Sequence, residues 1–172
     1  EQGAAVAVNT RSSREDAEKT ATMIRDAGGQ AEVFMADVID PAAVKAMVEG
    51  AVARFGRLDY LVLNASVRRE VKFMDMDYAE WRRPIDTTLD GAFHCIKACL
   101  PHMLKAGGGA IVTLGGAEQG IVGKVHSSAA KSGLAGMVRA LARELAPHNI
   151  RVNCVAPGLL DTTRPAHRSA RP

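Results

Sequence analysis

The sequence is short of cysteine, and the three that it has do not indicate a disulfide-stapled protein. Cys95, Cys99 and Cys154 are an odd number without the spacing of a disulfide framework. Unpaired thiols are typical of a reducing compartment, so we expect a cytoplasmic protein.

Long apolar runs are also missing. No run approaches the roughly 20 residues that a membrane helix needs. The opening residues 1–5 have neither the basic segment nor the apolar stretch of a signal peptide. We therefore expect no membrane partner and no membrane-spanning segment.

Net charge is low as well. The formal charge is +3, and the Lys and Arg residues are interleaved with Asp and Glu along the chain. An even mixture of this kind argues against nucleic acid or an anionic membrane as the main partner. A small-molecule substrate is the expected ligand.

What the sequence does contain is enough apolar material for one core. Of its 172 residues, 47% are apolar and 24% are charged, which is ordinary for a globular domain. No repeat, low-complexity block or linker divides the chain. Residues 1–172 are therefore expected to form a single domain.

Short apolar or β-branched runs alternate with longer helical patterns, which is the signature of a parallel sheet built from βαβ units. The expected strands are residues 4–9, 31–38, 58–63, 110–114 and 151–155. Helices are expected between them, including a long one that ends at residue 105 with a break near Pro84, and another at residues 127–146. This order predicts an α/β fold.

Local signals place several boundaries. Ser12 and Glu15 have the spacing of a capping box, and Asp40 followed by Pro41 is a typical helix start. Residues 58–63 form a nearly continuous apolar run, which predicts a central strand covered on both faces.

Five motifs, in this order and spacing, together resemble the short-chain dehydrogenase/reductase family, and most nearly its β-ketoacyl carrier-protein reductases. They are Asp37-Val38, Leu63-Asn64-Ala65, Ile111-Val112-Thr113, Lys131-Ser132-Gly133 and the run at residues 151–158. The resemblance implies a Rossmann-type doubly wound parallel sheet. It also implies a further strand and a glycine-rich phosphate loop before Glu1, and further elements after the chain's last residue, so we expect a domain incomplete at both ends.

The resemblance also implies a nicotinamide cofactor. The family uses an acidic residue after the strand matching residues 4–9 to select NAD, whereas this chain has Asn9 and Arg11 there and no carboxylate before Glu15. NADP is therefore expected in preference to NAD. The lesser alternative is that Arg11 is an ordinary solvated loop residue. The other implied cofactor-binding residues are Asp37, Val38, Asn64, Ala65, Lys131, Pro157, Gly158, Leu160 and Thr162. Ser66 stands where the family usually has glycine.

Most of the catalytic groups that the resemblance implies are replaced. The family places a tyrosine four residues before a lysine on one helical face, where the ammonium lowers the phenol pKa from about 10. Here the lysine position is Lys131 and the tyrosine position is Ser127. The family's serine falls at Gly116, and its asparagine falls at Thr88.

Two functions follow from these replacements. One is an NADP-dependent oxidoreductase acting on a carbonyl or alcohol, and the other is a catalytically silent relative that serves as a binding or scaffold subunit. For the enzyme, the proton could come from His126, from Glu118 or Ser128, or from a water held by Lys131.

The long helices carry two further expectations. Cys95, Cys99 and His102 share one helical face, which is better explained by packing than by a metal site. The resemblance implies a homo-oligomer, a dimer or tetramer, formed through residues 88–105 and 127–146. We expect the apolar stripes with Cys95, Cys99, Leu134 and Val138 to contribute to it. By resemblance, the basic tail with Arg164, His167, Arg168 and Arg171 would be a flap over the substrate site, whereas such a sequence by itself is more often a frayed loop.

Overall fold

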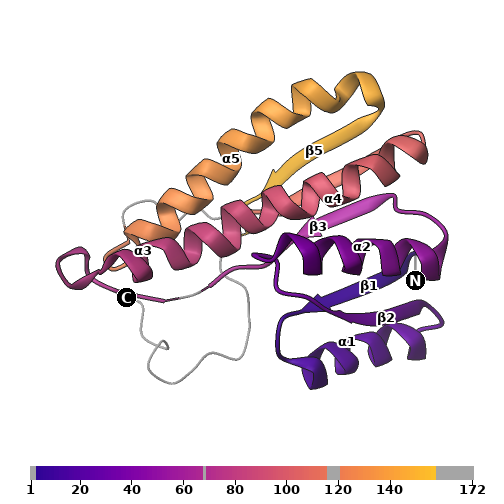
Figure 1. The fold of residues 1–172 in the computed structure, drawn as a ribbon, viewed down its shortest axis with the longest axis horizontal. Helices are drawn as coiled ribbons and strands as arrows, with labels where there is room; N and C mark the ends of the chain where they lie inside the picture. Colours follow the sequence, from indigo (N-terminus) through magenta and orange to yellow (C-terminus); the bar gives the residue numbers. More distant parts are fainter. Residues whose placement is uncertain (1–2, 68, 116–120, 158–172) are drawn as a thin grey trace.

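The computed structural model describes residues 3–67, 69–115 and 121–157, in which strands alternate with helices as predicted (Figure 1). The elements are β1 (Ala5–Thr10), α1 (Arg14–Asp26), β2 (Gln30–Met35), α2 (Pro41–Phe55), β3 (Tyr60–Leu63), η1 (Phe73–Asp75), α3 (Tyr78–Ile85), the π-helical turn η2 (Asp86–Asp90), α4 (Gly91–Lys105), β4 (Gly109–Leu114), α5 (Val125–Leu145), η3 (Ala146–His148) and β5 (Ile150–Val155). The fold is a Rossmann-like parallel α/β fold, which confirms the expected class. No helix in this part of the chain is both long and apolar enough to cross a bilayer.

Hydrogen bonding arranges the described strands in two parallel groups, β1–β2 and β3–β4–β5. Each connection between paired strands contains a helix, which is how parallel neighbours are joined. Within each group the strands therefore end at one common edge, and the residues that follow their carboxyl ends lie there together.

The expectation that residues 58–63 form a central strand covered on both faces is wrong for the part of the chain that the structure describes. β3 is shorter and lies at the edge of its group, paired with β4. Leu61 and Leu63 pack into the core with residues of α2, α4 and α5. Tyr60 and Val62 point the other way and are 68% and 63% exposed, because no described helix covers that face.

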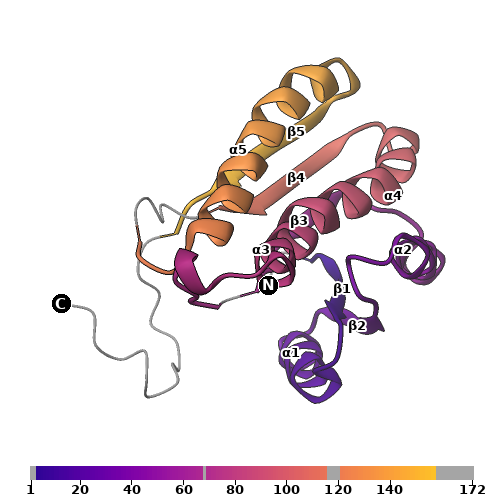
Figure 2. The same cartoon turned by 60° about the vertical axis from the view of Figure 1, so that its left-hand side comes forward.

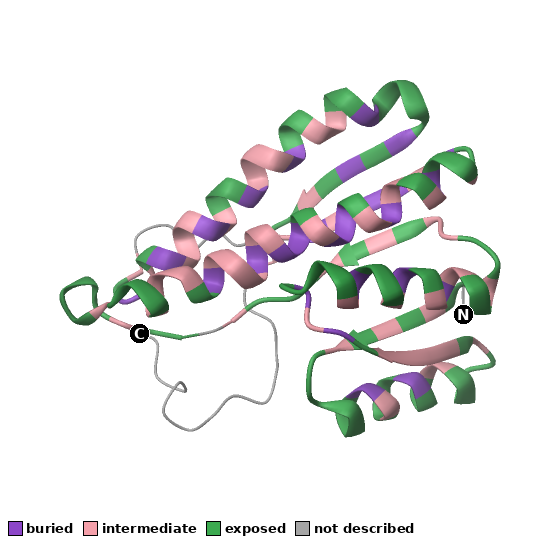
Figure 3. Ribbon diagram, viewed as in Figure 1, coloured by how far each residue is buried: buried purple, intermediate pink, exposed green. Residues whose placement is uncertain are grey.

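The core lies between β4–β5 and the helices α4 and α5 (Figures 2 and 3). Ile111 pairs in register with Val152, so both face the same side of the sheet. The core cluster consists of Val48, Ile96, Cys99, Met103, Ile111, Val138, Leu145, Ile150 and Val152. The apolar faces of the two long helices are therefore buried within the chain itself.

That burial corrects one argument for self-association. Cys95, Cys99, Leu134 and Val138 are at most 6% exposed, so these side chains are not free to form an interface between copies. An apolar helical stripe in a sequence predicts burial without saying what buries it.

Helix starts are partly as predicted. Asp40 caps α2, and its Oδ1 accepts hydrogen bonds from the Ala42 and Ala43 N–H groups at 2.9 and 3.2 Å. The capping box at the start of α1 is wrong, because the N-cap is Ser13 and it makes no side-chain capping bond. The Ser13 N–H instead donates to Thr10 Oγ1 at 3.2 Å.

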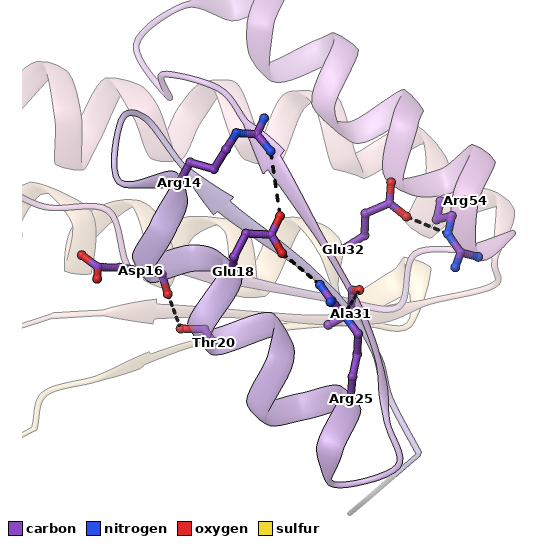
Figure 4. Close-up of polar contacts among 8 residues, drawn as sticks. All are labelled: Arg14, Asp16, Glu18, Thr20, Arg25, Ala31, Glu32 and Arg54. Atoms are coloured by element: carbon purple, nitrogen blue, oxygen red, sulfur yellow. Dashed lines mark hydrogen bonds and ion pairs between the residues drawn. The ribbon is translucent and has the colours of Figure 1, made fainter.

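Arg25 of α1 and Arg54 of α2 each contact a residue of β2 (Figure 4). Arg25, near the end of α1, donates from Nε to the Ala31 carbonyl at 3.1 Å and pairs with Glu18 at 3.1 Å. Arg54, near the end of α2, pairs with Glu32 at 2.7 Å. These contacts hold the last turns of α1 and α2 beside the first residues of β2.

Candidate functional site

A small cavity lies at the carboxyl ends of β3 and β4, under the π-helical turn. Its volume is about 10 Å³, which is room for about one water molecule. Its lining residues are Val38, Leu63, Ala65, Thr87, Thr88, Gly91, Ala92, Cys95, Leu114 and Leu134. Three residues singled out in the sequence, Val38, Ala65 and Thr88, thus come together from three separate segments.

The residues that follow β1 and β2 form the neighbouring part of the edge. Asn9 Nδ2 donates to the Phe34 and Ala36 carbonyls at 3.2 and 3.0 Å, so this amide ties the two strand ends together. Arg11 comes next, with Nη1 3.7 Å from Asp37 Oδ2. Both members of the pair follow the carboxyl ends of β1 and β2, the edge at which open parallel sheets bind ligands.

Asn64 and Ala65 directly follow β3 and are exposed at the same edge. Ser66, in place of the family's glycine, introduces no left-handed backbone, because Asn149 is the single non-glycine residue with positive φ among those described. A serine is therefore compatible with the backbone of this loop.

The predicted break in the long helix is a π-helical turn. α3, η2 and α4 follow one another without a gap, and Thr88 lies in the π turn with 5% exposure. Arg82 pairs with both Asp86 and Asp90 across the turn. π turns often occur at functional sites, and this one places the residue at the family's asparagine position beside the cavity.

Lys131 is held at the carboxyl end of β4. Its Nζ donates to the Leu114 carbonyl at 2.6 Å and lies 3.3 Å from the Gly115 carbonyl. Ser127 is half-buried one turn earlier on α5, so the two residues share a helical face. The helix begins at Val125 and not at Ser127, so His126 lies inside the helix and not before it.

The loop after β4 leaves no room for a side chain at Gly115. A Cβ there would lie 2.6 Å from Cys154 Sγ, and the Gly115 N–H donates to the Val155 carbonyl at 2.8 Å. A serine at residue 115 would therefore have to displace the Cys154 side chain, so this position favours glycine. Pro157 is half-buried just after β5. Several residues named from the sequence lie outside the described ranges: Gly116, Glu118, Gly158, Leu160, Thr162, Arg164, His167, Arg168 and Arg171.

The two long-helix cysteines are inert packing residues. Burial raises the pKa of Cys95 to about 11, and burial followed by the charge of Cys95 raises that of Cys99 to about 12. Thiols with such pKa values stay protonated near neutral pH and are poor nucleophiles and metal ligands. The burial of both side chains in the core is what the packing interpretation predicts. Within the described ranges no three His, Cys, Asp or Glu side chains gather as candidate metal ligands.

His126 is the residue that sequence reasoning undervalued. Its side chain is fully buried between α5 and α3, and neither ring nitrogen has a hydrogen-bond partner in the described structure. Burial lowers its pKa, and nearby Arg69 lowers it further, while Glu80 and the backbone of Lys124 raise it. Glu80 itself pairs with Arg69 at 3.1 Å. The first turn of a helix is an ordinary place for a solvated histidine, so the sequence gives no signal for such burial.

Acidification should destabilise the protein through His126. Because its folded-state pKa is lowered, the unfolded state binds the proton first, so stability is retained above about pH 6.5 and lost as pH falls below it. Chemical denaturation at pH 7.5 and pH 5 measures this loss, and His126→Gln should reduce it. His148→Gln, at an exposed position on η3, is the matched control. An equal acid loss in His126→Gln and in the unmodified protein would contradict the assignment.

The chain matches the family model of the short chain dehydrogenases over residues 1–171. The chain belongs to the short-chain dehydrogenase family. It is 41% identical over 162 residues to the 3-oxoacyl-acyl-carrier-protein reductase FabG of Staphylococcus aureus strain N315, covering 93% of this chain and 66% of that protein. This member of the family therefore spans about two thirds of the length of that relative.

Solved structures of short-chain dehydrogenases also resemble the structure of this chain. One, assigned as a short-chain alcohol dehydrogenase of Sinorhizobium meliloti 1021, has a TM-score of 0.89 and 40% identity, covering 98% of this chain and 66% of that one. A short chain dehydrogenase of Burkholderia cenocepacia J2315, solved with NADP, has a TM-score of 0.85 and 31% identity, covering 91% of this chain and 64% of that one. A 7α-hydroxysteroid dehydrogenase solved with NADH has a TM-score of 0.84 and 32% identity, covering 91% of this chain and 61% of that one.

Proposed function

We propose that the protein is an NADP-dependent oxidoreductase that interconverts a carbonyl and an alcohol. The observation that carries this proposal is the position of Lys131, whose ammonium is fixed at the carboxyl end of β4 by the Leu114 carbonyl at 2.6 Å. Ligands of open parallel sheets bind beside the strands' carboxyl ends, and Asn64 follows the end of the paired strand β3 there.

The residues at this edge fit a dinucleotide. Arg11 would face a 2′-phosphate, since it is an exposed cation that makes no hydrogen bond with its neighbour Asp37 at 3.7 Å. Asp37 and Val38 would flank the adenine, and Asn64 with Ala65 would line the ribose. Pro157, Gly158, Leu160 and Thr162 would cap the nicotinamide amide.

When bound at this edge, a nicotinamide cofactor would supply the hydride for the carbonyl carbon. The oxygen then needs a proton, and this chain's groups decide where it comes from. Ser127 cannot replace a phenol, because its hydroxyl is shorter and its pKa too high for one lysine to tune. Lys131 would hold the ribose and a water that passes the proton, which predicts slow turnover.

A second candidate, a silent binding subunit, is favoured by one observation. Ser127 occupies the shared face of α5 one turn before Lys131, where the proton donor is required. A protein that retained cofactor binding and reduced no carbonyl would match this function.

We also propose a homo-oligomer in the cytoplasm. Support for the compartment comes from Cys95, Cys99 and Cys154, all free thiols. Support for the oligomer is the resemblance to the family, in which the outer faces of α4 and α5 would form the interface.

Equilibrium binding of NADPH, followed by its own fluorescence, tests the proposal. Binding should be measurable, and Lys131→Met should weaken it about 10-fold or more, because a charge-assisted hydrogen bond to the ribose is lost. Thermal melts of the variant separate this loss from unfolding. Absence of NADPH binding to the full chain would contradict both candidate functions. With binding established, turnover of any ketone in a panel favours the enzyme, and none favours the silent subunit.

A further inference from the structure

The charges at the adenosine end of the site include a carboxylate that faces the arginine. Arg11 Nη1 lies 3.7 Å from Asp37 Oδ2, a distance that gives an ion pair without a hydrogen bond. The Arg11 side chain is 65% exposed and that of Asp37 is 29% exposed. The guanidinium therefore keeps its donors for another anion, while its charge is partly offset by Asp37.

Asp37 is the fixed member of this pair. Its Oδ1 accepts a hydrogen bond from the Ile39 N–H at 3.2 Å, which sets the plane of the carboxylate. The next residue, Val38, is 8% exposed and packs beside Gly91 of α4. Arg11 is the longer side chain and lies in the exposed turn between β1 and α1.

We propose that Asp37 sets how strongly this chain prefers NADP over NAD, by competing with the 2′-phosphate for Arg11. This inference rests on the proposed function, in which Arg11 faces that phosphate. With a ribose that carries a 2′-hydroxyl, the pair persists and nothing is lost. With a 2′-phosphate, Arg11 is shared between two anions, so part of its attraction for the phosphate is cancelled.

The expected size of the effect is modest. Two unit charges about 4 Å apart in a well-solvated setting interact by little more than the thermal energy, and exposed pairs contribute still less. Removing the Asp37 charge should therefore change the preference for the 2′-phosphate about 2- to 5-fold. A tight cofactor selectivity is not expected while Asp37 is present.

Calorimetric binding of two nucleotides to the full chain tests this directly. The probes are adenosine 2′,5′-bisphosphate and 5′-AMP, and the readout is the ratio of their dissociation constants. Any contact between Asp37 and the shared adenine cancels in this ratio. Asp37→Asn should raise the preference for the bisphosphate about 2- to 5-fold, and Arg11→Gln should lower it about 10-fold. The Asp37→Asn effect should largely disappear in the Arg11→Gln background.

Asp26→Asn is the matched control for net charge. Asp26 is exposed at the far end of the 13-residue helix α1, about 20 Å away along the helix axis. It should leave the ratio unchanged at physiological ionic strength, where the screening length is about 8 Å.

The possible outcomes distinguish a failure of the role of Asp37 from a failure of the NADP assignment. If Arg11→Gln lowers the ratio and Asp37→Asn does not raise it, the inference is wrong and the cofactor assignment stands. An equal rise from Asp37→Asn with and without Arg11 also overturns the inference, since Asp37 would then act on the phosphate by itself. If Arg11→Gln leaves the ratio unchanged, the assignment of NADP fails as well, and absence of binding by both nucleotides overturns both.

Discussion

Replacing Ser127 by tyrosine together with Gly116 by serine should raise ketone reduction by about 10²–10⁴-fold, the usual contribution of general acid catalysis. The phenol would lie one turn before Lys131 on the same face of α5, where the ammonium lowers its pKa. The serine would orient the substrate carbonyl. The measurement is NADPH oxidation at saturating cofactor over a panel of ketones.

The control for this experiment is Ser132→Tyr. Ser132 is exposed on α5 directly after Lys131, so it adds a phenol to the same helix at about 100° from the lysine. This variant should show no gain. A gain of equal size in Ser132→Tyr would contradict the role of residue 127, because the gain would not depend on where the phenol lies. No gain in the Ser127→Tyr and Gly116→Ser double variant, with NADPH still bound, would mean that the site lacks more than a proton donor.

Gly91→Ala should destabilise the protein by about 1–3 kcal/mol and weaken NADPH binding, although alanine is the better helix former. A Cβ at residue 91 would lie 2.7 Å from Val38 Cγ2 and 3.1 Å from Val38 Cβ. The start of α4 and the turn after β2 would have to separate, which displaces Asp37 and Val38 from the nucleotide edge. Chemical denaturation and NADPH titration measure the two effects.

Two variants make this prediction specific. Gly136→Ala, in α5, would meet nothing within 4 Å and should stabilise the protein by about 0.5–1 kcal/mol. Val38→Ala removes the clashing methyl groups and should recover most of the stability lost in Gly91→Ala. If Gly91→Ala stabilised the protein as Gly136→Ala does, the contact between α4 and Val38 would not exist.

The parallel α/β architecture was predictable because its signals are local. Apolar runs alternate with helical patterns, and Asp40 followed by Pro41 marks a helix start that the structure confirms. The position of Lys131 at the end of β4 also follows from the sequence, because the spacing of the motifs carries the family resemblance. The assigned roles of Ser127, Thr88 and Arg11 remain predictions.

Other features depend on contacts that no local pattern records. The apolar run of residues 58–63 could not reveal that β3 lies at an edge in the described structure, since its composition is the same whether one face or both are covered. The burial of His126 arises from the packing of α3 on α5. The π turn at Asp86–Asp90 adds one residue to a helix whose apolar pattern otherwise continues. Pro84 therefore indicated that the helix is interrupted here, but not that the interruption is a π turn.

The most direct test of the central claim is the turnover of the unmodified protein beside Ser127→Ala, measured as NADPH oxidation with a ketone panel at cofactor concentrations where binding is complete. The claim is that this member of the family keeps the cofactor edge and lacks a side-chain proton donor at residue 127. It predicts slow or undetectable turnover that Ser127→Ala does not change, against a 10²–10⁴-fold gain in the tyrosine variant. Fast turnover of the unmodified protein, in the range of the tyrosine variant, would contradict it and would show that another group delivers the proton.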